Sequence, residues 1–284
     1  SDDTQMTLFT LEGLLRSDLD DRDDVNEQIR LAYSDWLSTQ TDMPEDWEPT
    51  GTLYLVEALN RNQAPGNTCL SALQSGGWGT PENAINNSKG CGGVMRVAPI
   101  GFIRDWSPEQ AFDVAARAAA ITHGHPSGFW SAAAMSAMVR MMVDGEDLER
   151  AAEASLDMLA DKPGHEETTD AIDQALETYN SGPGDHTKAV RRLGEGWIGE
   201  EALSVSLYAA LSGNSFAEVM AIGANHDGDS DSTASIAGQL YGAWKGLSDL
   251  PHAWTRRLDV FDPMMRLIDP LLEHKHRQMA TSHQ

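Results

Sequence analysis

Two short acidic segments combine carboxylates and hydroxyls closely enough to bind metal ions: Ser1-Asp2-Asp3-Thr4 and Gly228-Asp229-Ser230-Asp231-Ser232-Thr233. Their oxygen atoms are the hard ligands that magnesium and calcium prefer. The second segment is not a calcium loop of the EF-hand type, because it has no glycine at the sixth position and no glutamate at the twelfth. Two groups of such dense negative charge repel each other unless cations lie between them. We therefore predict that the segments face each other and share a site for two divalent metal ions.

The same residue types also have an ordinary role, since Ser, Thr and Asp commonly cap the start of a helix. The segment at Ser1, taken alone, would be interpreted as such a cap. The segment at Asp229 is followed by Ala234, Gly238 and Gly242, whose four-residue spacing lets a helix pack closely against a neighbour. Carboxylates at the start of such a helix would be held rigidly, which favours a metal site over a simple cap.

Composition narrows the class of protein. The chain has 284 residues, 40% of them hydrophobic, which is enough to bury a core. A formal net charge of −24 disfavours nucleic acid as a partner, because such a surface repels phosphate polymers. No apolar run is long enough for a membrane span and no signal-peptide pattern opens the chain, so we expect a cytoplasmic monomer without a membrane partner. The only cysteines, Cys69 and Cys91, predict neither a disulfide framework nor a zinc site.

The elements that must position these residues are predicted to be helices. The spacing of apolar residues indicates helices at residues 4–16, 25–37, 108–121, 129–143, 146–160, 166–179, 186–193, 199–211, 215–223 and 232–245. The helix at 129–143 is apolar on nearly every side, which is typical of a helix at the centre of a bundle. Loops at 62–68 and 76–94 have the Gly-, Asn- and Pro-rich composition of backbone that approaches a ligand. Residues 161–187 are expected to form a surface excursion and residues 274–284 a frayed tail.

Several motifs occur in an order that resembles the ADP-ribosylglycohydrolase family, which includes the dinitrogenase reductase-activating glycohydrolase and the ADP-ribosylarginine hydrolases. The matching stretches extend over almost the whole chain and read Ser1-Asp2-Asp3-Thr4-Gln5-Met6, Ala64-Pro65-Gly66, Ser88-Lys89-Gly90-Cys91-Gly92-Gly93-Val94-Met95-Arg96, Ile121-Thr122-His123-Gly124-His125-Pro126-Ser127-Gly128, and His226 through Gly238. The sequences of these motifs are most similar to those of the arginine-directed branch of the family.

The resemblance implies an all-α domain over residues 1–284, a single compact orthogonal bundle of helices around a central dinuclear metal site. Two magnesium ions, or manganese in their place, would bind to Ser1, Asp2, Asp3, Asp229, Asp231 and Ser232. Asp2 and Asp3 would also be catalytic, and the metals would bind the ribose hydroxyls and orient a water. The implied substrate-binding residues are Gly66, Ser88, Lys89, Gly90, Cys91, Gly92 and His123. The loop at 87–94 would hold the pyrophosphate through its backbone N–H groups.

Some residues keep two interpretations. Arg96 either contacts phosphate or forms a buried ion pair, and His125 is interpreted as a histidine that caps a helix rather than as a ligand. Trp197, Glu200 and Glu201 are candidates for the adenine or arginine end of the ligand, but a core tryptophan and a solvated acidic pair are the preferred interpretation.

The implied activity is magnesium-dependent hydrolysis of the N-glycosidic bond of ADP-ribosyl-arginine on modified proteins. Family members carry a helix with a Gly-Asp-Ala-type motif before the first acidic segment, with a glutamate after it, and this pattern is not found in the chain, so we expect the sequence to lack that upstream helix. Two alternatives follow: a catalytically weak module that binds ADP-ribose or neutralises a toxin, or a hydrolase of another ADP-ribosyl linkage.

Overall fold

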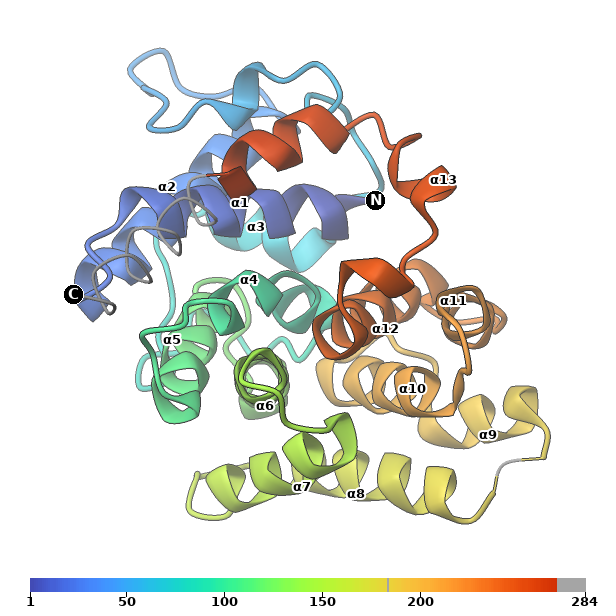
Figure 1. Cartoon of the computed structure of the whole chain (residues 1–284). Coiled ribbons are helices and arrows are strands. Elements are labelled where there is room, and N and C mark those ends of the chain that lie inside the picture. Colours follow the sequence, from blue (N-terminus) through green and yellow to red (C-terminus); the bar gives the residue numbers. More distant parts are fainter. Residues whose placement is uncertain (183, 270–284) are drawn as a thin grey trace, which may run out of the picture.

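The structure, a computed structural model, describes residues 1–182 and 184–269. Within these residues there is no β-strand, and an isolated β-bridge joins Gly90 to Ile198. The prediction of an all-α protein is confirmed (Figure 1). The helices are α1 (Asp2–Arg16), α2 (Arg22–Ser38), η1 (Leu53–Leu55), α3 (Asn67–Gln74), η2 (Cys91–Arg96), α4 (Ala98–Gly101), α5 (Pro108–Ala120), α6 (Pro126–Val143), α7 (Leu148–Leu159), α8 (Glu166–Asn180), α9 (His186–Leu193), α10 (Gly199–Ser212), α11 (Phe216–Ala224), α12 (Ser230–Lys245), η3 (Leu247–Asp249) and α13 (His252–Thr255). Residues 261–269 are also helical.

Every predicted helix has a counterpart within a few residues of its expected bounds. Short helices such as α3, α4 and η2 were not predicted, because four to eight residues contain too few turns to show an apolar period. The loop expected at 76–94 is therefore shorter than predicted, since the 3₁₀ helix η2 begins at Cys91.

The centre of the bundle is α6, whose residues from Ser127 to Arg140 are all buried. It packs against α5 and α7, and α5 meets it with an alanine-rich face that includes Ala111, Ala115 and Ala118. Small side chains on both helices let their backbones approach. In Figure 1, α6 is viewed along its axis while α1, α7 and α8 lie across the view, so the helices cross rather than run parallel.

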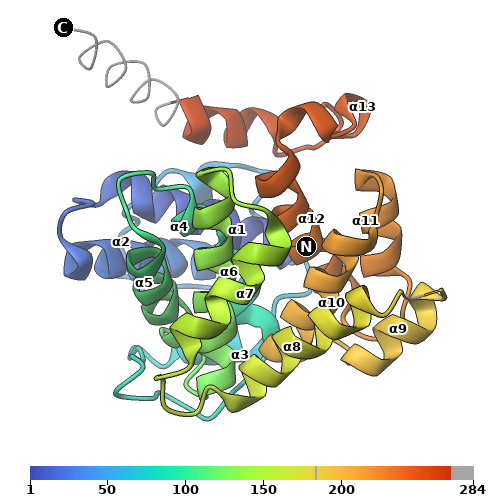
Figure 2. The same ribbon diagram turned by 60° about the horizontal axis from the view of Figure 1, so that its bottom comes forward.

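The prediction of a surface excursion at 161–187 is wrong for most of its length. Helix α8 occupies the middle of that segment and packs against α10, burying Thr168, Ile172 and Ala175. Hydrophobic burial of this apolar stripe overrides the Gly- and Pro-rich composition of the flanking turns. Figure 2 shows α7 and α8 on the outside of the bundle. The tail expected at 274–284 lies outside the described residues.

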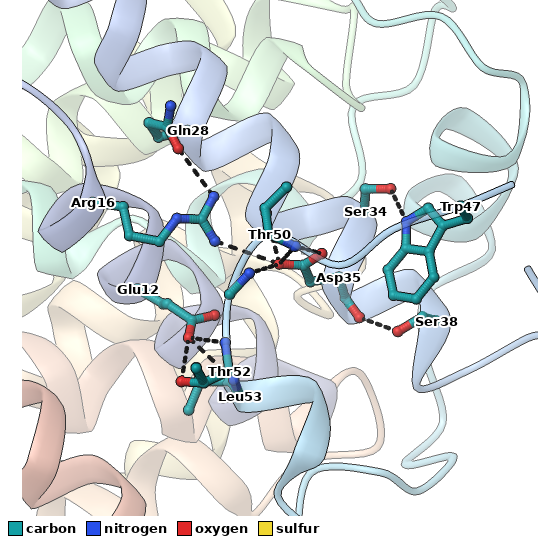
Figure 3. Close-up of polar contacts among 11 residues, drawn as sticks. Glu12, Arg16, Gln28, Ser34, Asp35, Ser38, Trp47, Thr50, Thr52 and Leu53 are labelled. Carbon is teal, nitrogen blue, oxygen red and sulfur yellow. Dashed lines mark hydrogen bonds and ion pairs between the residues drawn. The ribbon is translucent and has the colours of Figure 1, made fainter.

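A long connection between α2 and α3 is anchored by two buried carboxylates, Glu12 of α1 and Asp35 of α2 (Figure 3). Glu12 Oε1 accepts hydrogen bonds from the backbone N–H groups of Thr52 and Leu53, at 2.7 and 3.1 Å. Asp35 accepts from the N–H groups of Thr50 and Gly51 at 3.0 and 2.6 Å and pairs with Arg16 at 3.4 Å. These bonds replace the regular secondary structure that the connection lacks. We call Glu12 and Asp35 the carboxylate clamp.

In residues 1–182 and 184–269, every helix is too short or too polar to serve as a membrane span.

Candidate active site

The two acidic segments meet in space, because α1 and α12 begin at the same place in the bundle. Carboxylate oxygens of Asp2, Asp3 and Asp231 all lie within 4.8 Å of one another. Both views place the N-terminus beside α12 (Figures 1 and 2). Residues more than 200 positions apart in the sequence therefore form one acidic cluster. We call Asp2, Asp3, Asp229 and Asp231 the carboxylate cluster.

Capping does not account for this cluster. Ser1 and Asp229 occupy the N-cap positions of α1 and α12, yet neither side chain makes a capping hydrogen bond. Ser1 Oγ instead donates to Asp3 Oδ2 at 2.8 Å, and Asp229 Oδ2 accepts from the Cys91 thiol at 2.9 Å. The side chains point toward the cluster rather than toward the helix ends.

The electrostatics of the cluster are unfavourable without a cation. Burial, followed by the charges of Asp3 and Asp231, raises the pKa of Asp2 to about 7. Burial is also the largest cause that raises the pKa values of Asp3 and Asp229. Asp3 is fully buried, and its Oδ1 has no hydrogen-bond partner. A buried acceptor without a donor, next to other carboxylates, is the arrangement that a divalent cation stabilises, so the residues fit a hard metal ion.

The turn before α12 aims Asp229 into the cluster. Its backbone N–H donates to the carbonyl of Glu195 at 2.8 Å, and a Cβ on Gly228 would overlap that carbonyl, so only glycine fits there. The imidazole of His226 braces the same turn: its Nδ1 accepts from the Gly228 N–H at 3.2 Å and its Nε2 contacts Thr233 Oγ1 at 2.8 Å.

The loop at 87–94, which we call the glycine-rich loop, lies between the start of α6 and the start of α10. Ser88 accepts the His125 N–H at 3.1 Å through its carbonyl, and the carbonyl of Lys89 accepts the Gly199 N–H at 2.8 Å. Cys91 closes the loop against Asp229 and also lies 3.7 Å from Ser232 Oγ. Burial, followed by the charge of Asp229, raises the pKa of the Cys91 thiol. The loop therefore forms one wall of the carboxylate cluster.

The other predicted substrate-binding residues lie around this wall. The Gly66 N–H donates to Asp2 Oδ2 at 3.1 Å, which links the 62–68 loop to the cluster. Ser88 Oγ contacts Thr68 Oγ1 at 3.0 Å. The Lys89 ammonium pairs with Glu167 at 2.9 Å and with Glu200 at 2.8 Å. A role for Lys89 in binding phosphate stays a prediction, and it would compete with both ion pairs.

The residues with two interpretations are now placed. His125 is the N-cap of α6 and accepts the Ser127 N–H, so its interpretation as a capping histidine is confirmed. Arg96 is fully buried but has no carboxylate partner among the described residues, so the ion-pair interpretation is wrong and the contact with phosphate stays a prediction. Its guanidinium lies 4.2 Å from the centre of the Tyr33 ring. Trp197 is 56% exposed rather than a core residue.

The two acidic neighbours after Trp197 are not a simple solvated pair. Glu200 is buried and pairs with Lys89. Glu201 accepts the backbone N–H groups of Glu195 and Gly196, at 3.0 and 3.2 Å. Both glutamates therefore position loops of the site.

Two contacts of the site were not predicted. The thiol of Cys91 touches Asp229, although the residues are 138 positions apart in the sequence. Thr122 contacts the ring of its neighbour, His123, at 2.8 Å between Oγ1 and Nδ1. Adjacency to a candidate histidine is the single sequence signal that could have found Thr122.

Comparison with known proteins identifies the family of the chain. The sequence profile of the family described as ADP-ribosylglycohydrolase matches residues 1–281. The chain is 23% identical over 278 residues to the ADP-ribosyl-[dinitrogen reductase] glycohydrolase of Rhodospirillum rubrum, covering 96% of this chain and 78% of that one. It is 23% identical over 213 residues to the ADP-ribosylarginine hydrolase Tri1 of Pseudomonas putida, covering 73% and 53% respectively. The chain thus spans about half the length of the Pseudomonas protein.

Mouse ADP-ribosylhydrolase ARH3 is 23% identical over 313 residues, covering 99% of this chain and 78% of the mouse protein. A solved structure titled ADP-ribosylglycohydrolase-related protein complex superposes with a TM-score of 0.59, at 23% identity, over 94% of this chain and 78% of that one. That likeness shows the shared fold. With a profile that matches nearly the whole sequence, the chain belongs to the ADP-ribosylglycohydrolase family of enzymes.

Proposed function

We propose that the protein hydrolyses the N-glycosidic bond between ADP-ribose and an arginine side chain of a modified protein, and that it requires magnesium. The observation that carries the proposal is the convergence of Asp2, Asp3 and Asp231 within 4.8 Å. With Asp3 Oδ1 buried and without a hydrogen-bond partner, this cluster suits two hard divalent ions. Ser1, Ser232 and Asp229 complete the proposed ligand set.

Magnesium bound here would supply the positive charge that binds ribose hydroxyls and polarises a water molecule. The protein's own residues set the geometry. Asp2 Oδ2 is held by the Gly66 N–H, which leaves Oδ1 as the oxygen that can accept a proton from the attacking water. Asp3 is fixed by Ser1 through Oδ2 and presents Oδ1. In the glycine-rich loop, the N–H groups of Gly90 and Cys91 already donate to Ser88 Oγ and to the Trp197 carbonyl, at 3.3 and 3.2 Å. The remaining backbone N–H groups of the loop would bind the pyrophosphate.

Two observations support arginine as the leaving group. The relative from Pseudomonas putida is named an ADP-ribosylarginine hydrolase. A chain with a net charge of −24 attracts a cationic guanidinium and repels anions. The diphosphate is then bound by backbone donors rather than by a cationic surface.

The test is release of ADP-ribose from a panel of peptides modified on arginine or on serine, with magnesium chloride or with excess EDTA. We expect turnover of the arginine conjugate with magnesium alone, and none after Asp231→Asn. The matched control is Asp227→Asn: Asp227 is in the same turn, but its side chain is 97% exposed and outside the cluster. Equal turnover with EDTA would overturn the metal requirement. Preference for the serine conjugate would overturn the substrate, and ADP-ribose binding without turnover of any conjugate would overturn the activity.

A further inference from the structure

The side chain of His123 is buried at the back of the glycine-rich loop, with only 1% of its surface exposed. Its Nδ1 lies 2.8 Å from Thr122 Oγ1. A Cβ built on Gly92 would lie 2.9 Å from the ring carbon Cε1, and one built on Gly90 would lie 3.3 Å from Nε2. The Nε2 edge of the ring therefore faces the loop, and in the described residues that nitrogen has no protein hydrogen-bond partner. A ring nitrogen so placed is available to a ligand in the loop.

The other edge of the ring is fixed by a chain of contacts that begins at Arg96. One guanidinium nitrogen of Arg96, Nη2, donates to Thr122 Oγ1 at 2.8 Å and to the carbonyl of Ala118 at 3.1 Å. A guanidinium has donors only, so Thr122 Oγ1 accepts this bond. The hydroxyl proton then has two acceptors within reach, Nδ1 of His123 and the sulfur of Cys69. Sulfur is the weaker acceptor, so the proton goes to Nδ1. The lone pair of Nδ1 faces Thr122, which leaves the ring proton on Nε2.

The charge of Arg96 acts in the same direction. Its buried guanidinium has no carboxylate partner within residues 1–182 and 184–269 and lies over the ring of Tyr33. A positive charge on this side of His123 favours the ring edge that carries a lone pair. Burial, followed by Arg96, lowers the pKa of His123 to about 3, so the ring stays neutral and does not serve as a general acid near neutral pH.

We propose that Arg96 and Thr122 are positioning residues that hold His123 as a neutral imidazole with its proton on Nε2, so that the ring donates one hydrogen bond to an oxygen of an ADP-ribosyl ligand in the glycine-rich loop. The ligand part of this inference rests on the proposed function. A pre-oriented neutral donor suits a chain of such negative charge, because it binds a ligand oxygen without introducing a charge that must be desolvated.

The tautomer is measured directly in the free, full-length protein by long-range proton–nitrogen NMR on histidine labelled with ¹⁵N. The His123 signals are those missing from the spectrum of His123→Gln. We expect a protonated Nε2 and an unprotonated Nδ1, unchanged between pH 6 and pH 8. Thr122→Val removes the hydroxyl at nearly constant volume and should give a mixture of tautomers, whereas Thr122→Ser should restore the wild-type spectrum. A proton on Nδ1 in the wild type would show that the hydroxyl of Thr122 donates to the neighbouring Cys69 sulfur instead, and would overturn the proposal.

Binding of ADP-ribose is measured by calorimetry with magnesium present. An equal mixture of tautomers halves the binding-competent fraction, so Thr122→Val should weaken binding about twofold and Thr122→Ser should match the wild type. His123→Asn, which removes the donor at the Nε2 position, should weaken binding about tenfold. If Thr122→Val does not fold, the pair His123→Gln and His123→Asn replaces it. The glutamine amide can reach the Nε2 position and should bind more tightly than asparagine, whose amide lies at the Nδ1 position. Equal affinity of the wild type, Thr122→Val and both His123 variants would overturn the proposal.

The two layers of the inference fail separately. If the wild type binds no ADP-ribose and hydrolyses no conjugate, the proposed function and the ligand part of this inference are overturned together. The positioning part is decided by the NMR spectrum of the free protein alone, which requires neither ligand nor turnover.

Discussion

Helix α1 carries two groups of buried carboxylates that have opposite relations to their surroundings. Near its C-terminal end, Glu12 joins Asp35 in the carboxylate clamp, where backbone N–H groups and Arg16 face the carboxylates (Figure 3). At its N-terminal end, Asp2 and Asp3 belong to the carboxylate cluster and face Asp231. The residue type and the degree of burial are similar in both places.

One oxygen in each group, Glu12 Oε2 and Asp3 Oδ1, is buried without a hydrogen-bond partner. What differs is the neighbours, which are hydrogen-bond donors in the clamp and other carboxylates in the cluster. Asp35 accepts hydrogen bonds on both oxygens, so its charge is compensated within the protein. Asp3 receives one bond from Ser1 and leaves Oδ1 buried without a partner. Neither burial nor an unpartnered oxygen therefore indicates a binding role by itself; the convergence of several carboxylates does.

The largest effect that separates the two groups concerns activity. Asp3→Asn should lower kcat/KM for an ADP-ribosyl conjugate by about a thousandfold or more, because a metal ligand contributes several kcal/mol to stabilising the transition state. Asp35→Asn should change it by no more than about threefold in protein that is still folded. Steady-state assays with magnesium measure both. A comparable loss in Asp35→Asn, with an intact unfolding transition, would contradict the distinction.

The second effect concerns stability without metal, where substitution of Asp35 should have a larger effect than substitution of Asp3. Asp35→Ala should lower the free energy of unfolding by about 3 kcal/mol, because it leaves Arg16 and the N–H groups of Thr50 and Gly51 without an acceptor. Asp3→Asn should leave stability unchanged or raise it by about 1 kcal/mol, since it removes a buried like charge. Urea denaturation in EDTA compares them, and a strongly destabilised Asp3→Asn would contradict the assignment of the cluster.

Magnesium should raise the free energy of unfolding by binding to the carboxylate cluster, and variants of the carboxylate clamp should not alter this gain. At a concentration of 100 times its Kd, the ion should add about 2.7 kcal/mol to the free energy of unfolding. That gain should persist in a folded Asp35→Asn variant and disappear in Asp231→Asn. Thermal unfolding as a function of magnesium concentration measures the gain, with Asp227→Asn as the control. Equal stabilisation of Asp231→Asn would place the bound ion elsewhere.

The smallest effect is a pH dependence that is specific to Asp2. Its pKa is raised from 3.8 to about 7 in the folded protein, so between those values the unfolded state releases the proton first and stability falls as pH rises. In EDTA, the wild type should lose about 1 kcal/mol relative to Asp2→Asn between pH 6 and pH 7. Denaturation curves of both proteins at several pH values give the difference. A constant difference across this range would contradict the raised pKa.

The long helices could be predicted from the sequence, because their apolar residues repeat over three or more turns, as in α2 and α5. Around α8 two predictions conflicted: apolar spacing gave a helix at 166–179, and the Gly- and Pro-rich turns on either side suggested a surface excursion. The spacing was right, because Ile172 and Ala175 are buried. The short helix α3 and the 3₁₀ helix η2 contain too few turns for their apolar residues to show a helical period. Arg96 illustrates a different limit, since the sequence cannot show that a buried cation lies over Tyr33 instead of pairing with an acid.

For the site, the sequence alone determined the chemistry: hard oxygen ligands in two segments, a glycine-rich loop and a histidine beside it. These are properties of residue type and local spacing, so they can be read without coordinates. Only the tertiary structure decided which groups meet. It placed Asp231 beside Asp2 and Asp3, engaged Lys89 with Glu167 and Glu200, and put Thr122 between Arg96 and His123. Such contacts join residues that are distant in the sequence, and they follow from how whole helices pack, which no local pattern encodes.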